Sequence, residues 1–328
     1  MKVGVVVLAV LFVFTSKSYC DMSSKQFQLS NLLKNSQLVV KGKIVQVKSD
    51  DNYYKMSFSV EDLLIGTMSS NKIEVVSRFK NGFRLEDEPY LEEGKEYILF
   101  LSNTKSVWTI TNRIAGVLSV NAADDLKKVI QDYKLQEKLF DKGNCGKLIS
   151  LFDKVETEYI KNLLLLDIEE NLTANEFNFV KRLIESNNKK TKMFGIKHAG
   201  KLKLNELHES VKQTLLTSTD PREKFYSISA LGEYSDIKDL NVLQRFLTEN
   251  EQANRRVAIY ALMNLKSELV IEPLINAYKS ESDWGNKSAI ISVLKSFSDK
   301  KEVREALSDF RTSERNKFLQ DYIDDILK

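Results

Sequence analysis

The 328-residue sequence predicts an α+β protein in two parts, a small β-barrel followed by an α-helical solenoid. Two observations carry this prediction. From about Leu38 to Val120, short segments alternate apolar and polar residues, which is the period of a β-strand with one buried face. Beyond that region, one helical phrase recurs at an interval of 31 residues. A fixed interval of this length indicates stacked units of supersecondary structure.

The first twenty residues are expected to be an export signal that is removed. Lys2 precedes an apolar run of twelve residues from Val3 to Phe14, and Ser18 and Cys20 suit the −3 and −1 positions of a signal-peptidase site. Twelve apolar residues are too few to span about 30 Å of hydrocarbon, which argues against a membrane anchor. We therefore expect a secreted or periplasmic chain that begins near residue 21.

The net charge of the chain does not favour a nucleic acid or an anionic membrane as its partner. The chain has 49 basic and 46 acidic residues, and removal of the export segment would take away Lys2 and Lys17. The remaining charge of +1 is close to neutral, whereas nucleic-acid-binding domains are usually strongly basic. With 42% hydrophobic and 29% charged residues, the sequence is that of an ordinary folded protein of about two domains.

The two cysteines leave three alternatives open. Cleavage after Cys20 leaves Cys145 as a lone thiol in an oxidising compartment, whereas cleavage before Cys20 allows a disulfide between them. We favour the third alternative, in which Cys145 is buried and inert. The sequons at Asn171 and Asn286 matter only if the source organism glycosylates its exported proteins.

Residues 21–121 are assigned to the barrel. In its clearest strand, Tyr54, Met56, Phe58 and Val60 alternate with polar residues, and Gly42 interrupts an earlier strand where a bulge is expected. Five or six short strands in about 85 residues suit a small closed barrel. The other expected strands and turns are Leu38–Val47, Ile73–Val76, Tyr97–Leu101, Val107–Ile110, Asn81-Gly82 and Glu93-Gly94.

Three segments of this region, 39–45, 60–66 and 91–101, resemble the small exported OB-fold domains related to the N-terminal domain of tissue inhibitors of metalloproteases (NTR-type domains). The resemblance covers about a quarter of the chain and implies an OB-like barrel. Those inhibitors chelate the protease zinc through a mature N-terminal cysteine. Cys20 lies near the cleavage point, but the accompanying cysteines of the family are missing. Protease inhibition through the barrel is therefore one alternative function.

Residues 122–188 are predicted to form a helical connector. A helix is expected from Ala122 to Leu139, and Gly143 to Gly146 then breaks it. This glycine pair is no phosphate-binding loop, because only two residues separate the glycines where that motif needs four. Two further helices are expected, around 159–166 and 177–184.

Residues 189–328 contain the repeats and a capping helix at 316–327. Copies of the phrase begin at Lys224, Arg255 and Asn286, with a weaker copy from Lys192, and a second helix follows each copy. Such two-helix units resemble short HEAT-like repeats over residues 189–310, which implies an α-helical solenoid. Small residues mark the expected close helix contacts, in two columns: Ser227, Ala258 and Ala289, and Ala230, Ala261 and Ser292.

We found no motif that predicts catalysis, a metal or a cofactor. Of the two histidines, His198 is expected to be packed, and neither it nor His208 lies in a spacing of carboxylates or cysteines that completes a metal site. The basic run at 189–203 is either a docking strip for an anion or partner or, as we favour, a solvated helix surface. HEAT-like proteins that act as bilin lyases make a lyase a further alternative, although no residues can be assigned to it.

The preferred function is that of an exported, non-enzymatic scaffold that binds a protein through the solenoid. Such arrays expose an extended concave face, which we expect the consecutive second helices to form. With Leu240, Leu243, Phe246, Ile271 and Leu274 facing inward, four polar residues remain on the open face. The predicted protein-binding residues are Asn241, Arg245, Glu272 and Asn276.

Overall fold

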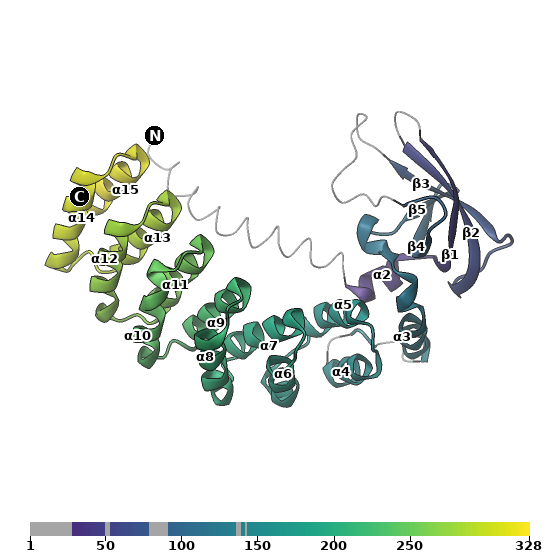
Figure 1. Ribbon diagram of the computed structural model, residues 1–328, viewed down its shortest axis with the longest axis horizontal. Coiled ribbons are helices and arrows are strands. Elements are labelled where there is room, and N and C mark those ends of the chain that lie inside the picture. Colours follow the sequence, from purple (N-terminus) through teal and green to yellow (C-terminus); the bar gives the residue numbers. More distant parts are fainter. Residues whose placement is uncertain (1–27, 50–52, 79–90, 136–138, 142) are drawn as a thin grey trace. The chain divides into compact units, whose positions relative to one another are not determined.

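The computed structural model describes residues 28–328 except 50–52, 79–90, 136–138 and 142 (Figure 1). The chain divides into two compact units, one that ends at Leu172 and one that runs from Thr173 to Lys328. The predicted class, a small OB-like barrel followed by a helical solenoid, is confirmed. The predicted export segment and the Asn81-Gly82 turn lie outside the described residues. The unit boundary falls within the predicted connector.

The barrel is a sheet that closes on itself. Its strand order is β1-β2-β3-β5-β4, and β1 also pairs with β4, while β6 adds a short edge. All these pairings are antiparallel except that between β3 and β5. The strands are β1 (Leu38–Ser49), β2 (Tyr53–Ile65), β3 (Lys72–Arg78), β4 (Glu96–Thr104), β5 (Val107–Ile110) and β6 (Val117–Leu118).

Gly42 lies where β1 must bend, as the sequence predicted. The register between β1 and β2 shifts between Lys41 and Gly42. A Cβ atom at Gly42 would lie 2.0 Å from the carbonyl oxygen of Ser59 on the partner strand, so only glycine fits at this position without movement of the backbone. At the other expected turn, Gly94 has a φ of +82°, a conformation that favours glycine.

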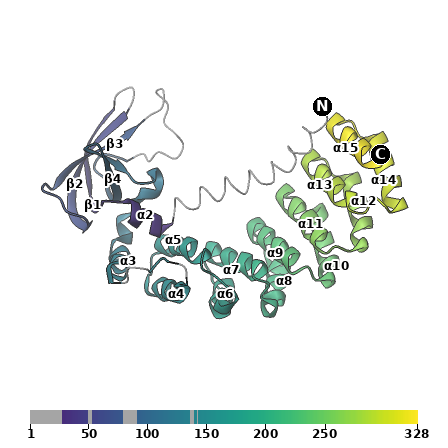
Figure 2. The same cartoon turned by 180° about the vertical axis from the view of Figure 1, so that it is seen from behind.

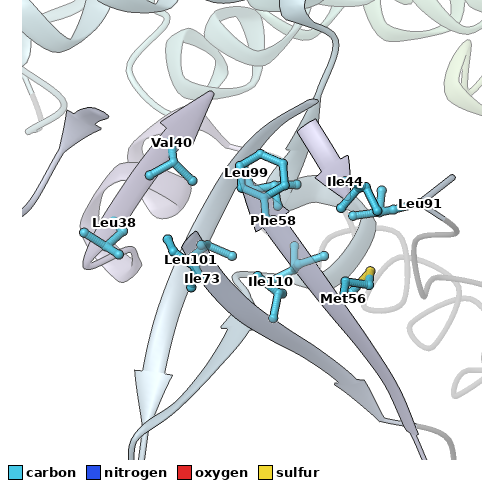
Figure 3. Packing of buried hydrophobic residues seen from close by; sticks show 11 residues of the cluster. Leu38, Val40, Ile44, Met56, Phe58, Ile73, Leu91, Leu99, Leu101 and Ile110 are labelled. Atoms are coloured by element: carbon cyan, nitrogen blue, oxygen red, sulfur yellow. The ribbon is translucent and has the colours of Figure 1, made fainter. Parts of the chain in front are cut away.

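The alternating residues of β2 point into the barrel. Phe58 is fully buried and Met56 nearly so, and they meet Leu99 and Leu101 of β4 in one cluster (Figure 3). Each such side chain contributes about 1.5–3 kcal/mol to the free energy of unfolding. The barrel is therefore filled by its own side chains, drawn from strands that are distant in the sequence.

In the described part of the first unit, four α-helices accompany the barrel, and two of them begin beside a carboxylate from another helix. Asp125 accepts hydrogen bonds from the backbone N–H groups of Glu156 and Thr157 at the start of α5. Asp167 of α5 accepts one, at 2.9 Å, from the N–H of Leu29 at the start of α2. These contacts satisfy donors that a helix cannot pair internally. The helices are α2 (Leu29–Asn35), α3 (Ala123–Leu135), α4 (Cys145–Lys154) and α5 (Glu158–Glu169).

Two expectations in this region can be compared directly with the structure. Helix α3 ends at Leu135, earlier than predicted, and Leu139 lies in a turn, where it is buried. The prediction extended the helix to Leu139 because this residue is apolar, but a buried residue in a turn is apolar just as one on the buried face of a helix is. Cys145 is buried at the start of α4, as the favoured alternative required.

The second unit consists of helices, several of them joined through short 3₁₀ turns. Asp220 caps α9 and Pro221 occupies its first position, where a missing N–H costs little. Residues Lys203, Ser235 and Lys266 repeat a left-handed backbone conformation after successive helices. The helices are α6 (Phe177–Ile184), α7 (Lys189–Lys201), α8 (His208–Thr217), α9 (Pro221–Tyr234), α10 (Leu240–Leu243, continued by a 3₁₀ turn at Gln244–Thr248), α11 (Gln252–Asn264), α12 (Ile271–Ser280), α13 (Trp284–Lys295), α14 (Lys301–Ser313) and α15 (Lys317–Leu327).

Glycines set the close packing of α7, α9 and α11. A Cβ atom at Gly200 would lie 2.5 Å from the Cα of Ala230, and one at Gly232 would lie 2.7 Å from the Cα of Ala261. In the next repeat Met263 takes the glycine position. Accordingly α13 packs less closely on α11, and Ser292, predicted to mark a close contact, is exposed.

Two rows of helices result within the second unit. The inner row, α7, α9, α11 and α13, follows the inside of the curve, and the outer row, α8, α10, α12 and α14, follows the outside (Figures 1 and 2). This corrects our expectation that the second helices form the concave face. The reason is the glycine–alanine contacts, which draw the inner-row helices together, so that the solenoid bends toward them.

Candidate partner-binding surface

The described residues offer no sign of a metal centre. Among them, no group of three or more His, Cys, Asp and Glu side chains is placed to hold a metal ion. Within the same part of the chain, no helix is both long and apolar enough to cross a membrane.

A charged cluster around His208 links two repeats. His208 Nε2 lies 2.6 Å from one oxygen of Asp239, and Lys212 Nζ lies 3.1 Å from the other. Asp239 has no exposed surface, so its carboxylate has these side chains rather than water as its partners. His198 is also buried, with its ring 4.2 Å from that of Phe194, as the expectation of a packed histidine required.

A second set of charges repeats along the solenoid. In each case a cation near the start of an inner-row helix meets an acid that directly follows the next outer-row helix along the chain. The carboxylate of Glu281 accepts two hydrogen bonds from Arg255 and one from Asn286. The three pairs are Lys224–Glu249, Arg255–Glu281 and Lys287–Glu314.

Two of these acids, Glu281 and Glu314, are held in their charged form. Burial raises the pKa of the Glu281 carboxyl, but hydrogen bonds from Arg255, the backbone of Asp283 and Asn286 outweigh burial and lower its pKa from 4.5 to about 2. Glu314 behaves alike, since Lys287 and neighbouring donors lower its pKa to about 2. The repeated pairs, which we call the charge clamps, therefore stabilise the repeats, and their charges are internally matched.

The predicted binding residues lie on the outer row. Asn241, Arg245, Glu272 and Asn276 are all exposed. Of the residues expected to face inward, four are buried and Leu240 is half-buried. The predicted helix register is thus confirmed, while the binding role of the four exposed residues stays a prediction.

The inner row presents a different surface. Residues at positions i, i+7 and i+11 of a helix share one face, and on α7 these are the exposed Lys190, Lys197 and Lys201. Equivalent stripes on α9, α11 and α13 complete what we call the inner face. Its exposed or half-exposed members are Lys190, Phe194, Lys197, Lys201, Arg222, Phe225, Tyr226, Ser229, Glu233, Ala253, Arg256, Tyr260, Asn264, Trp284, Ser288 and Lys295.

Charge is distributed unequally between the rows. The inner-row helices contain eleven Lys or Arg and two Glu, whereas the outer row, with the 3₁₀ turn after α10, contains six basic and five acidic residues. Of these cations, Lys189, Lys192, Lys224, Arg255, Arg256 and Lys287 pair with loop or helix-end acids. Lys190, Lys197, Lys201, Arg222 and Lys295 are exposed.

Aromatic side chains lie toward the other end of the inner row. Trp284 is 59% exposed and Phe318 54% exposed, and their rings meet edge to face at 6.2 Å. Tyr260 and Met263 on α11 are each 39% exposed. Large side chains of this kind dominate the energetics of protein interfaces when they become buried.

The barrel has a surface feature of its own, an open groove of about 1090 Å³ beside β3 and β5. Tyr53, Lys55, Met68, Lys72 and Trp108 are among its lining residues. Trp108 also packs on the barrel core. Among the described residues that line the groove, none is a buried polar group of the kind that fixes a small ligand.

Comparison with known families gives a match in the helical unit. The family of HEAT repeats matches residues 208–295, which run from the first residue of α8 to the last of α13. The matched range begins with an outer-row helix and ends with an inner-row helix, a different phase from the units that we set from the sequence, which begin with an inner-row helix. No curated protein matches the chain.

This phase explains what the sequence reasoning missed. Each unit that we set from the sequence began with the most regular segment, which forms an inner-row helix. We then assigned the helix after it, which lies in the outer row, to the concave face. The charge of the separate helices would have pointed to the inner row, because the basic run at 189–203 continues at Arg222, Arg256 and Lys295. Overall composition hid this asymmetry, since acids elsewhere balance it.

Proposed function

We propose that this chain is an exported, non-enzymatic scaffold that binds a protein partner on the inner face of its HEAT-like repeats. HEAT arrays use extended concave surfaces for binding, and the inner row provides such a surface here. The observation that carries the proposal is that the inner face exposes cations and large aromatic side chains together. These side chains contribute little to the core, so stability alone does not account for them.

The outer row is a second proposed surface, formed by Asn241, Arg245, Glu272 and Asn276. Polar groups of mixed charge can discriminate between partners, and all four are exposed. The inner face is favoured because it adds aromatic anchors, which supply most of the binding energy in protein interfaces.

Affinity capture from the native source, followed by mass spectrometry, tests the two surfaces against each other. The full chain would be compared with Tyr260→Ala/Trp284→Ala on the inner face and with Arg245→Glu/Asn276→Lys on the outer row. We expect the inner-face variant to recover much less of the partner and the outer-row variant to recover as much as the parent. Equal melting temperatures for all three would show that the fold is intact.

Two results would contradict this assignment. Loss of the partner only in the outer-row variant would move the binding site to that row. Equal recovery of the partner by all three proteins would exclude both helical surfaces as the binding site. The barrel would then be the candidate, with an inhibitor-like function.

Export is a separate part of the proposal. It is supported by the apolar run from Val3 to Phe14 and by Ser18 and Cys20. Intact mass of the exported protein should give a chain that begins near residue 21, and a mature species that retains Met1 would overturn the proposal. In the folded chain Asn286 has no exposed surface and donates to Glu281, so its sequon is unavailable for a glycan after folding.

A further inference from the structure

We infer that the inner face takes an acidic polypeptide segment, with its carboxylates over α7 and α9 and an aromatic or large apolar side chain over α11 and α13. This inference rests on the proposed function and specifies the chemistry of the partner. It follows from the order in which charges and aromatic side chains occur along the row.

The basic end is formed by α7 and the start of α9. Lys190, Lys197 and Lys201 follow one stripe of α7, and all are exposed. Arg222, the residue of α9 that corresponds to Lys190, is exposed as well. Lys189 and Lys192 pair with Asp220 and Glu223. The exposed Lys190 and Arg222 are therefore the cations that would attract the carboxylates of a partner.

The aromatic end is formed by α11 and α13. Here Met263 replaces the glycine of the preceding repeats, and Tyr260 and Met263 are left partly exposed. Trp284 and Phe318, whose rings meet edge to face, add exposed aromatic side chains at the starts of α13 and α15. Lys295, the last residue of α13, lies 5.9 Å from the ring centroid of Tyr322.

The length of the segment follows from helix spacing. Packed helices lie about 8–10 Å apart, so the three steps from α7 to α13 span roughly 24–30 Å. An extended chain advances about 3.3 Å per residue, and about eight or nine residues are enough to join the two ends. The partner motif should therefore place its aromatic residue within about nine positions of its acidic residues.

A polypeptide fits this order better than a nucleic acid. At the aromatic end, Asp321, Asp324 and Asp325 of α15 are matched by Lys317, Arg311 and Lys328, so this helix offers no excess of positive charge to a strand that carries a phosphate at every step. A polypeptide can change from acidic to apolar along its length. It can thus match the basic end and bury an apolar side chain at the other.

Selection from a displayed library of random twelve-residue peptides on the immobilised full chain tests the inference. We expect the selected peptides to be rich in Asp and Glu and to contain Trp, Phe, Tyr or Leu. Lys190→Glu/Arg222→Glu should weaken their binding about tenfold at 0.15 M salt, and less at 0.5 M salt because screening reduces charge attraction. Trp284→Ala should weaken it about fivefold.

The charge reversals are chosen so that the fold survives. Lys190 and Arg222 lie in the first turns of α7 and α9, where a carboxylate is favoured by the helix dipole. The matched control is Arg245→Glu/Lys301→Glu, which makes the same change of charge on the outer row, and we expect parent-like binding from it.

The outcomes separate this inference from the proposed function. Selected peptides without an acidic excess, or with the same affinity for the parent and for Lys190→Glu/Arg222→Glu, would overturn the inference and leave protein binding in place. Failure to select any peptide would count against both. A third result would be that the chain binds a fluorescent twenty-nucleotide dT strand more tightly than any selected peptide at 0.15 M salt. That result would show that the inner face prefers a nucleic acid to a polypeptide.

Discussion

Glu281→Gln should destabilise the helical unit strongly at neutral pH, because it removes the charge at the centre of one charge clamp. The Glu281 side chain is 4% exposed, and that of its partner Arg255 is 16% exposed. The carboxylate also accepts hydrogen bonds from the N–H groups of Ser282 and Asp283. An amide oxygen can keep some of these bonds, but Arg255 is left without its buried counter-charge.

The magnitude follows from the pKa. The pKa of Glu281 falls from 4.5 to about 2 in the folded state, which corresponds to a ceiling of about 3.4 kcal/mol at neutral pH. Because the amide retains part of the network, we expect a loss of about 2–3 kcal/mol. For a unit of this size, that lowers the melting temperature by about 5–10 °C.

The effect should also depend on pH in a definite direction. A carboxyl whose pKa is lowered by folding stabilises the protein fully above its unfolded pKa, here 4.5, and progressively less as the pH falls toward about 2. At pH 3.5 the parent has lost about 1.4 kcal/mol of this contribution. The gap in stability between parent and Glu281→Gln should therefore narrow.

Thermal unfolding followed by circular dichroism at pH 7 and pH 3.5 measures both effects. Glu272→Gln is the control, since it makes the same chemical change at an exposed position of the same helix; its melting temperature should stay within about 1 °C of the parent. An equal loss in both variants, or a gap for Glu281→Gln as wide at pH 3.5 as at pH 7, would refute the reasoning.

Three further predictions concern packing and burial. Ala258→Asp places a carboxylate at a position with no exposed surface and should cost about 3–5 kcal/mol in urea unfolding; an unchanged midpoint would show that this column is not buried. Gly232→Val should cost about 2–3 kcal/mol, since even a Cβ would lie 2.7 Å from the backbone of Ala261, whereas Gly146→Ala, which meets nothing within 4 Å, should not destabilise the chain. Burial raises the pKa of Asp167 from 3.8 to about 7, although hydrogen bonds from Ser30 and Leu29 oppose this shift, so the parent loses stability as the pH rises from 4 to 7. Asp167→Asn lacks this loss, and its free energy of unfolding should rise by about 2–4 kcal/mol relative to that of the parent over the same range. Urea midpoints that change in parallel with pH in the two proteins would contradict this prediction.

Local features of the barrel could be predicted because single residues determine them. The alternation around Phe58 fixed the buried face of β2, and Gly42 marked the bulge. The pairing of β1 with β4 joins residues about sixty positions apart, and no local pattern encodes such a contact. The same limit applies to Asp125 and Asp167, which cap helices far from them in the sequence.

In the helical unit the repeat period was visible, but its phase was not. A period of 31 residues is the same wherever a unit is taken to begin, so periodicity could not show which helix lies on the inside. That choice depends on where the chain can approach most closely, at Gly200 and Gly232. The exposure of Arg245 and Asn276 was predicted correctly, because it depends only on the register of one helix.

Site-specific photo-crosslinking tests the central claim, that a protein partner lies on the inner face. A benzophenone side chain would be placed in the full chain at Tyr260 on the inner face, at Asn276 on the outer row, or at Tyr53 beside the barrel groove. Each protein would be irradiated with the captured partner. We predict adducts from Tyr260 and none above background from Asn276 or Tyr53. Adducts from Asn276 or Tyr53 without any from Tyr260 would contradict the account.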